Sequence, residues 1–170
     1  LSFQDTTLEL RPLNVLIGAN GSGKSNLIEA ISLLQGAPRN LASALERGDG
    51  VQGWINKGFL KLSSTIACEL EDDDSGLPFR YTLQFGERGH ALVIFNESLV
   101  QTSGGSENYV FDRVEHTFAL GRACAPPLLP DDGEQVKLHD SLLGGGGFLD
   151  LAFRPARAIA KWFSAIRIYR

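Results

Sequence analysis

The sequence contains no methionine, only two cysteines and no long apolar run. Cys68 and Cys124 lie far apart, and neither has a second Cys or a His at ligand spacing, which excludes a disulfide framework and a zinc site. The longest apolar runs, such as 13–17 and 91–95, are far shorter than the roughly 20 residues of a membrane-spanning helix. No secretory signal is visible. We therefore expect a cytoplasmic protein without membrane contact, trimmed at its start because it opens on Leu1.

The chain also lacks a strong excess of either charge, since it carries 16 basic and 20 acidic residues and has a net charge of −4. This balance does not indicate a nucleic-acid-binding protein, although local patches can outweigh a global sum. The segment 151–170 is such a patch, with five basic residues and no acidic one. Near the end, Ile159, Trp162, Phe163 and Ile166 are expected on one face of a helix, with Pro155 in its first turn.

One motif carries recognisable chemistry. Residues 18–25 read G-A-N-G-S-G-K-S, which matches the phosphate-binding loop of two glycines around four free positions followed by Lys and Ser. Glycines let successive backbone N–H groups turn toward phosphate oxygens, and the following helix adds its positive N-terminal dipole. Lys24 suits the β- and γ-phosphates as a mobile charge, and the Ser25 hydroxyl suits Mg²⁺.

The surroundings of the loop strengthen this interpretation. Residues 7–10 alternate and 13–17 form an apolar run, which predicts an edge strand followed by a buried strand that leads into the loop. From Gly23 the pattern is helical to about residue 36. A short helix is expected over 40–47 with Asn40 as its cap, and a glycine-rich connection over 48–53.

The middle of the chain has a different character. Short runs rich in β-branched and aromatic residues are separated by turn clusters, which predicts an antiparallel meander over residues 57–120. The runs are 59–70, 78–85, 90–100, 108–114 and 115–120. Together with the first segment this indicates an α/β fold. Residues 121–170 are expected to hold a loop, the helix near the end and the start of a further strand at 166–169.

The stretch L-N-V-L-I-G-A-N-G-S-G-K-S-N-L-I-E-A-I at 13–31 resembles the start of RecF, SMC and related ATPases of the ABC class. The resemblance covers roughly the first 36 residues. It implies a P-loop NTPase fold of the ABC ATPase head, with 1–170 as the N-terminal part of one domain divided into a core at 1–56, the β-lobe at 57–120 and a helical segment at 121–170.

The same resemblance implies the ligands and their contacts. ATP and Mg²⁺ are the expected cofactors, and an ATP-dependent homodimer is the expected assembly. The residues expected to surround the triphosphate run from Asn20 to Asn26, and Ser25 would bind the metal. These residues are Asn20, Gly21, Ser22, Gly23, Lys24, Ser25 and Asn26. Asn20 would either tolerate left-handed backbone geometry or contact a phosphate directly.

An ATPase of this class also needs an acidic strand and a serine-glycine-glycine signature. Ala91–Glu97 imitates the first, with Glu97 in the position of the general base, and Thr102–Ser106 imitates the second. Their order along the chain is the reverse of the family's, so we interpret them as a strand and a hairpin turn. Gln135 is a weak candidate for the metal-sensing glutamine, and Asp150 is expected in a loop or a helix cap. His90, His116 and His139 have no visible partner.

Catalytic residues therefore remain unassigned, and three functions stay open. The first is the ATP-binding half of an ABC-type ATPase that hydrolyses negligibly by itself. The second is a self-contained P-loop kinase or nucleotide switch. The third is a nucleic-acid-binding module, in which Arg154, Arg157 and Lys161 would follow phosphates, although an ordinary solvated helix face also explains these residues and is the interpretation that we favour.

Overall fold

A computed structural model describes residues 5–45, 51–54, 63–71, 76–89, 91–114, 117–120, 141, 143 and 154–169. Three helices come first: α1 over Lys24–Gly36, α2 over Leu41–Leu45 and α3 over Val51–Trp54. Five strands follow: β1 over Ser63–Glu71, β2 over Pro78–Arg88, β3 over Ala91–Ser103, β4 over Ser106–Val114 and β5 over Thr117–Leu120. The last element is α4 over Arg154–Ala165. Among the described helices none is long and apolar enough to cross a membrane.

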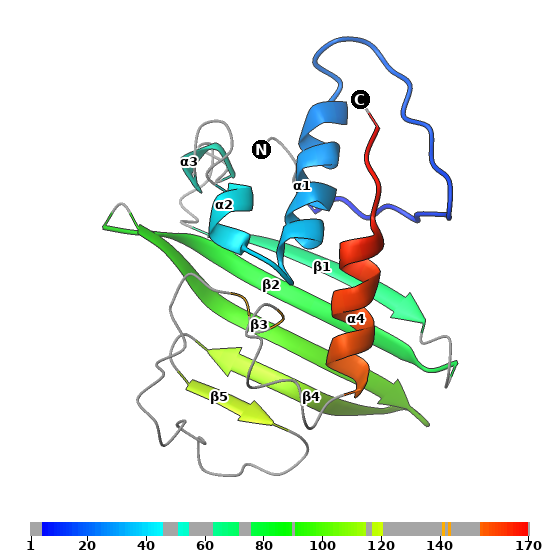
Figure 1. Ribbon diagram of the computed structural model, residues 1–170, viewed down its shortest axis with the longest axis vertical. Helices are drawn as coiled ribbons and strands as arrows, with labels where there is room; N and C mark the ends of the chain where they lie inside the picture. Colours follow the sequence, from blue (N-terminus) through cyan, green and yellow to red (C-terminus); the bar gives the residue numbers. More distant parts are fainter. Residues whose placement is uncertain are drawn as a thin grey trace.

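The strands form one antiparallel sheet in the order β1-β2-β3-β4-β5, so each strand pairs with its neighbours in the sequence (Figure 1). This confirms the predicted meander. Alternation decides which face is buried. On β2, Phe79, Tyr81, Leu83 and Phe85 are all at most 2% exposed, while the residues between them are polar. Such a pattern gives an antiparallel sheet one apolar face and one polar face.

Helices cover the apolar face of the sheet. Leu33 of α1 and Leu41 and Leu45 of α2 share one core with the strand side chains. Gly36 lets α1 and α2 approach closely, because a Cβ atom there would lie 2.6 Å from Ala44 Cβ. Helix α4 lies across the strands beside α1, and Phe163 packs edge-on against Tyr81 with a centroid distance of 5.2 Å (Figure 1).

The structure confirms several local predictions. Helix α1 begins and ends within a residue of the predicted range. The Asn40 side chain accepts a hydrogen bond from the Ser43 N–H at 2.9 Å, as expected of the cap of α2. Pro155 lies in the first turn of α4.

The prediction of two strands before the loop is wrong. No described residue between 5 and 23 belongs to a strand, and Leu13 and Ile17 are 84% and 91% exposed. An apolar run forms a buried strand only where neighbouring strands supply hydrogen bonds and cover. The sheet formed by the described residues lies wholly within 63–120 and offers 13–17 neither.

Three smaller predictions also fail. Part of the predicted connection 48–53 is helical, since α3 begins at Val51. Residues 166–169 do not form a strand. Trp162, expected on the buried face of the last helix, is 42% exposed, because the position lies at the edge of the stripe that Ile159 and Phe163 define.

Candidate phosphate-binding site

The predicted phosphate-binding loop is formed at the start of α1. Gly21 has φ 80° and Gly23, the N-cap of the helix, has φ 90° and ψ 2°, so both adopt the left-handed conformation that glycine tolerates. The chain can therefore reverse direction and enter the helix at Lys24. Figure 1 shows that this end of α1 is the one farther from the sheet. The glycines of the motif thus have the conformational task that the sequence assigned to them.

The start of α1 has no acidic residue in its first turn and no side-chain cap that would compete with an anion. The first N–H groups of a helix have no carbonyl partner within the helix, and together with the helix dipole they attract negative charge. A phosphate group would satisfy both the geometry and the charge at this position.

Lys24 closes the loop on itself. Its Nζ atom donates to the carbonyl oxygens of Gly18 at 2.7 Å and Ala19 at 2.6 Å and lies 3.3 Å from Ser22 Oγ. The ammonium group thus bridges the two ends of the loop. Gly18 is also closely approached, because a Cβ atom there would lie 2.8 Å from Ser22 Oγ. The loop has room for a glycine at this position but not for a larger residue without a shift of Ser22.

The other predicted ligands lie around the same turn. Asn20 and Ser22 are exposed in the loop, and Ser25 and Asn26 are in the first turn of α1. Asn20 does not have positive φ; among the described non-glycine residues only Asp5 does. The hypothesis that Asn20 tolerates left-handed geometry is therefore wrong, because Gly21 absorbs the turn instead. The direct phosphate contact of Asn20 stays a prediction.

The residues fit Mg²⁺ only in part. Ser25 is exposed at the start of α1, where its hydroxyl could reach a metal ion on a bound phosphate. Within the part of the chain that the structure describes, no group of three or more His, Cys, Asp or Glu side chains could hold a metal ion. A metal at this site would also take phosphate oxygens and water as ligands.

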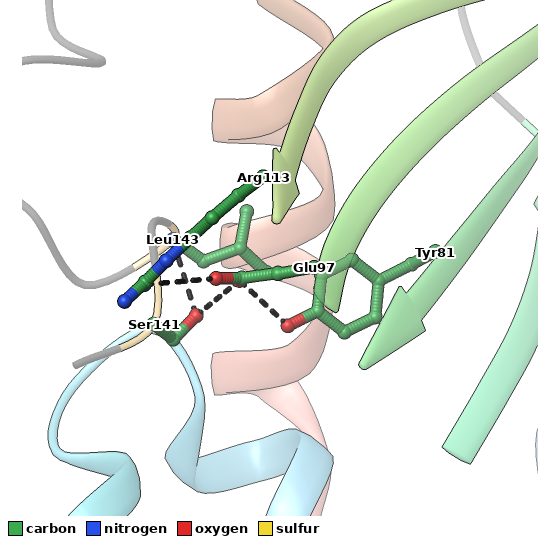
Figure 2. A network of polar contacts seen from close by, with 5 residues as sticks. All are labelled: Tyr81, Glu97, Arg113, Ser141 and Leu143. Atoms are coloured by element: carbon green, nitrogen blue, oxygen red, sulfur yellow. Dashed lines mark hydrogen bonds and ion pairs between the residues drawn. The ribbon is translucent and has the colours of Figure 1, made fainter. Parts of the chain in front are cut away.

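Glu97 belongs to a buried polar network instead of a catalytic site (Figure 2). Its side chain is 0% exposed, and its Oε1 atom accepts hydrogen bonds from Tyr81 Oη at 2.8 Å and Ser141 Oγ at 2.6 Å. Arg113, which faces Glu97 across β3 and β4 and is 1% exposed, places Nη1 3.8 Å from Oε2. Ser141 Oγ also accepts from the Leu143 N–H at 3.2 Å.

The network explains the protonation of Tyr81. Burial raises the pKa of the Tyr81 phenol well above its ordinary value, and the neighbouring Glu97 charge adds to this rise. The phenol therefore stays neutral and acts as a donor to the carboxylate. Since Glu97 lies against core side chains, it has no access to water and cannot act as the general base of a reaction at the loop.

The second imitation of a catalytic motif is a turn, as predicted. Thr102–Ser106 joins β3 to β4, Ser103 pairs with Ser106, and Gly104 and Gly105 have φ 57° and 78°. Two consecutive residues with positive φ suit a two-residue hairpin. Gln135, Asp150, His90, His116 and His139 lie outside the described residues.

The sequence did not reveal the partners of Glu97. Tyr81 and Arg113 lie at inward positions of two strands that flank β3, and Ser141 comes from a distant segment. The available signal was the alternation on β4, which places a charged Arg113 on the same face as Phe111. A charge at an inward position calls for a buried partner of opposite sign.

Comparison with known proteins yields one match. Residues 13–137, well over half of the chain, match the model of a family described as "AAA domain, putative AbiEii toxin, Type IV TA system". No curated protein and no solved structure matches the chain. The matched range includes both the loop and the antiparallel sheet.

Proposed function

Since the chain belongs to this AAA-domain family of P-loop ATPases, we propose that residues 18–25 bind ATP together with Mg²⁺ and that the chain supplies the ATP-binding part of an ATPase. The observation that carries the proposal is the start of α1, where left-handed Gly21 and Gly23 lead into a helix without a side-chain cap. An ammonium group within reach of the ligand and an uncapped helix start are the two features that a phosphate chain requires.

Each residue of the loop has a task in this proposal. Backbone N–H groups between Asn20 and Asn26 would surround the phosphates. Lys24 would leave the carbonyl oxygens of Gly18 and Ala19 and pair with the β- and γ-phosphates. Mg²⁺, held in part by Ser25, would offset charge on the phosphate oxygens. Because Lys24 already has two acceptors, binding exchanges its contacts and does not create all of them anew.

We further propose that the ATPase is of the RecF/SMC-like ABC type and forms a homodimer when it binds ATP. Two features support this proposal. The stretch 13–31 resembles the start of RecF and SMC, and the loop is exposed, so that the phosphates of a bound ATP would be accessible to a second subunit. Sedimentation velocity measures the oligomeric state of the chain in the presence of ATP and of ADP. A monomer under both conditions would contradict the dimer without affecting the binding site.

Hydrolysis by this chain alone should be negligible. Binding of the phosphates stabilises ground state and transition state alike, and acceleration requires groups that act more strongly on the transition state. Glu97, which occupies the position of the general base in the sequence 91–97, is enclosed in the core. Steady-state phosphate release tests this, and robust turnover would indicate a self-contained enzyme such as the P-loop kinase or switch.

Isothermal titration with Mg-ATP tests the binding site. Lys24→Ala removes a charge-assisted contact worth about 1.5–3 kcal/mol, so affinity should fall on the order of 10-fold to 100-fold. Arg39→Ala is the control, because it removes a positive charge from an exposed position outside the loop. Equal affinity of Lys24→Ala and the unaltered protein would refute the assignment of the site.

A further inference from the structure

The outer face of α4 and the residues after it concentrate positive charge. Residues 151–170 have a net charge of +5, which leaves the first 150 residues with −9. Arg157, Lys161 and Arg167 are exposed, and none of them forms an ion pair within the described part of the chain. Since 157 and 161 are one helical turn apart, their side chains lie in one row on the surface.

Arg167 adds a third exposed basic side chain just after the end of the helix. Its Nη1 atom donates to the carbonyl oxygens of Ser164 at 3.1 Å and Ile166 at 3.2 Å. These contacts hold the guanidinium group at the C-terminus of α4 and so reduce the entropic cost of binding a ligand there. The position of α4 is also fixed, because Gln35 Nε2 of α1 donates to Ile166 O at 2.8 Å.

Two exposed aromatic side chains accompany the charges. Trp162 is 42% exposed and follows Lys161 directly, and Tyr169 is 89% exposed beyond Arg167. Trp162 also borders a shallow hollow with Leu70, Glu71 and Phe79, so part of its ring is held in place while the rest is open to solvent. Glu71 gives this hollow a negative charge. Anions would therefore be attracted to Arg157 and Lys161 and not to the hollow.

We propose that the exposed surface of α4 and of the residues after it, which carries Arg157, Lys161, Trp162, Arg167 and Tyr169, binds single-stranded nucleic acid. Its basic groups neutralise the phosphate backbone, and its aromatic rings stack on bases that are not paired. A duplex could contact only the basic side chains through its phosphates, because its bases are stacked inside the helix.

The buried side of α4 argues against an anionic membrane as the partner. A helix that lies on a membrane buries its apolar face among the lipids. Here Ala156, Ile159 and Phe163 are at most 3% exposed because they pack on the sheet. The face that remains open is basic and aromatic, which matches a single strand.

Fluorescence polarisation with labelled oligothymidylate and oligouridylate of about 16 nucleotides tests the proposal on the purified chain. Binding should weaken on the order of 10-fold or more in Arg157→Glu/Lys161→Glu. The slope of log affinity against log salt should fall by about 0.7 for each phosphate that the variant no longer neutralises. Arg39→Glu, a reversal at an exposed arginine outside α4, should leave that slope unchanged.

Stacking is tested separately. Trp162→Ala should weaken binding by about 5-fold to 100-fold, and Trp162→Phe should restore most of it. The chain has two tryptophans, so a Trp54→Phe variant leaves Trp162 as the only source of indole fluorescence, which the bound strand should quench. Circular dichroism on every variant verifies that the fold is intact.

Four results would overturn the proposal. The first two are no binding to either oligonucleotide, and equal effects on affinity of Arg39→Glu and of the charge reversal on α4, Arg157→Glu/Lys161→Glu. The other two are an unchanged affinity in Trp162→Ala, and a duplex bound as tightly as the single strand. Binding to phosphatidylserine vesicles that the α4 reversal abolishes, without binding to oligonucleotides, would assign the face to membranes instead. None of these results depends on whether the loop at 18–25 binds ATP.

Discussion

Replacing Glu97 with glutamine tests whether this residue stabilises the fold or takes part in catalysis. Glutamine keeps an oxygen that can accept from Tyr81 and Ser141, so the two hydrogen bonds at 2.8 Å and 2.6 Å can persist. What disappears is the negative charge beside Arg113, whose side chain is 1% exposed. The substitution therefore removes a counter-charge of a buried guanidinium.

The size of this effect follows from the geometry. At the observed Nη1–Oε2 distance of 3.8 Å, two unit charges attract by about 4 kcal/mol for an effective dielectric constant of about 20. Removal of one member of a buried pair typically costs about 3–5 kcal/mol, because the other charge stays desolvated. We expect Glu97→Gln to lower the free energy of unfolding by this amount. That is a large part of the roughly 5–15 kcal/mol of an ordinary domain.

Urea unfolding followed by circular dichroism measures this loss of stability. A double-mutant cycle with Arg113→Met isolates the pair, and the double variant should be more stable than the sum of the single effects predicts. Calorimetric titration of the still folded Glu97→Gln fraction should give unaltered affinity for ATP. An unchanged urea midpoint together with a loss of phosphate release would refute the structural role and assign Glu97 to catalysis.

Three further perturbations test the local structure. Burial raises the pKa of Cys68 from 9.0 to about 12, so the unfolded thiol ionises first, and stability present below pH 9 should decline as the pH rises to about 12. Cys68→Ala should show a shallower decline in urea midpoints, and an identical slope would contradict this. Asn40→Ala removes the cap of α2 and should cost about 1 kcal/mol in thermal unfolding, with Asn40→Asp as a largely neutral control. Gly21→Ala imposes φ 80° on a residue with a Cβ atom, at a cost on the order of 1–2 kcal/mol, and should weaken ATP binding in a titration; unaltered affinity would show that the loop adopts another conformation when it binds.

Local features were predictable because short-range physics determines them. The glycines, Lys24 and the helix that follows them are adjacent in the chain, so the motif and the helical pattern together predict the loop. The meander was predictable for the same reason, since each strand pairs with the next across a short turn. Asn40 and the Ser103–Ser106 hairpin are further cases in which residue type and position suffice.

Contacts between distant segments were not predictable from one sequence. The apolar run 13–17 predicts a strand, but a strand needs neighbours, and the described sheet offers this run none. Glu97 has the residue type of a general base, yet its burial beside Tyr81, Arg113 and Ser141 depends on how the sheet is covered.

The sequence by itself determined where the proposed phosphate-binding loop lies, because the glycines of the loop and the charge of Lys24 lie within eight consecutive residues. Only the tertiary structure decided which charged side chains are buried and which are open to a ligand. Glu97 and Arg113 are enclosed between sheet and helices, whereas Arg157 and Lys161 face solvent, because α4 packs its apolar side on the strands. Burial is a property of the assembled elements: a buried charge needs a partner of opposite sign because it is desolvated, whereas the same residue types at the surface stay available to a ligand.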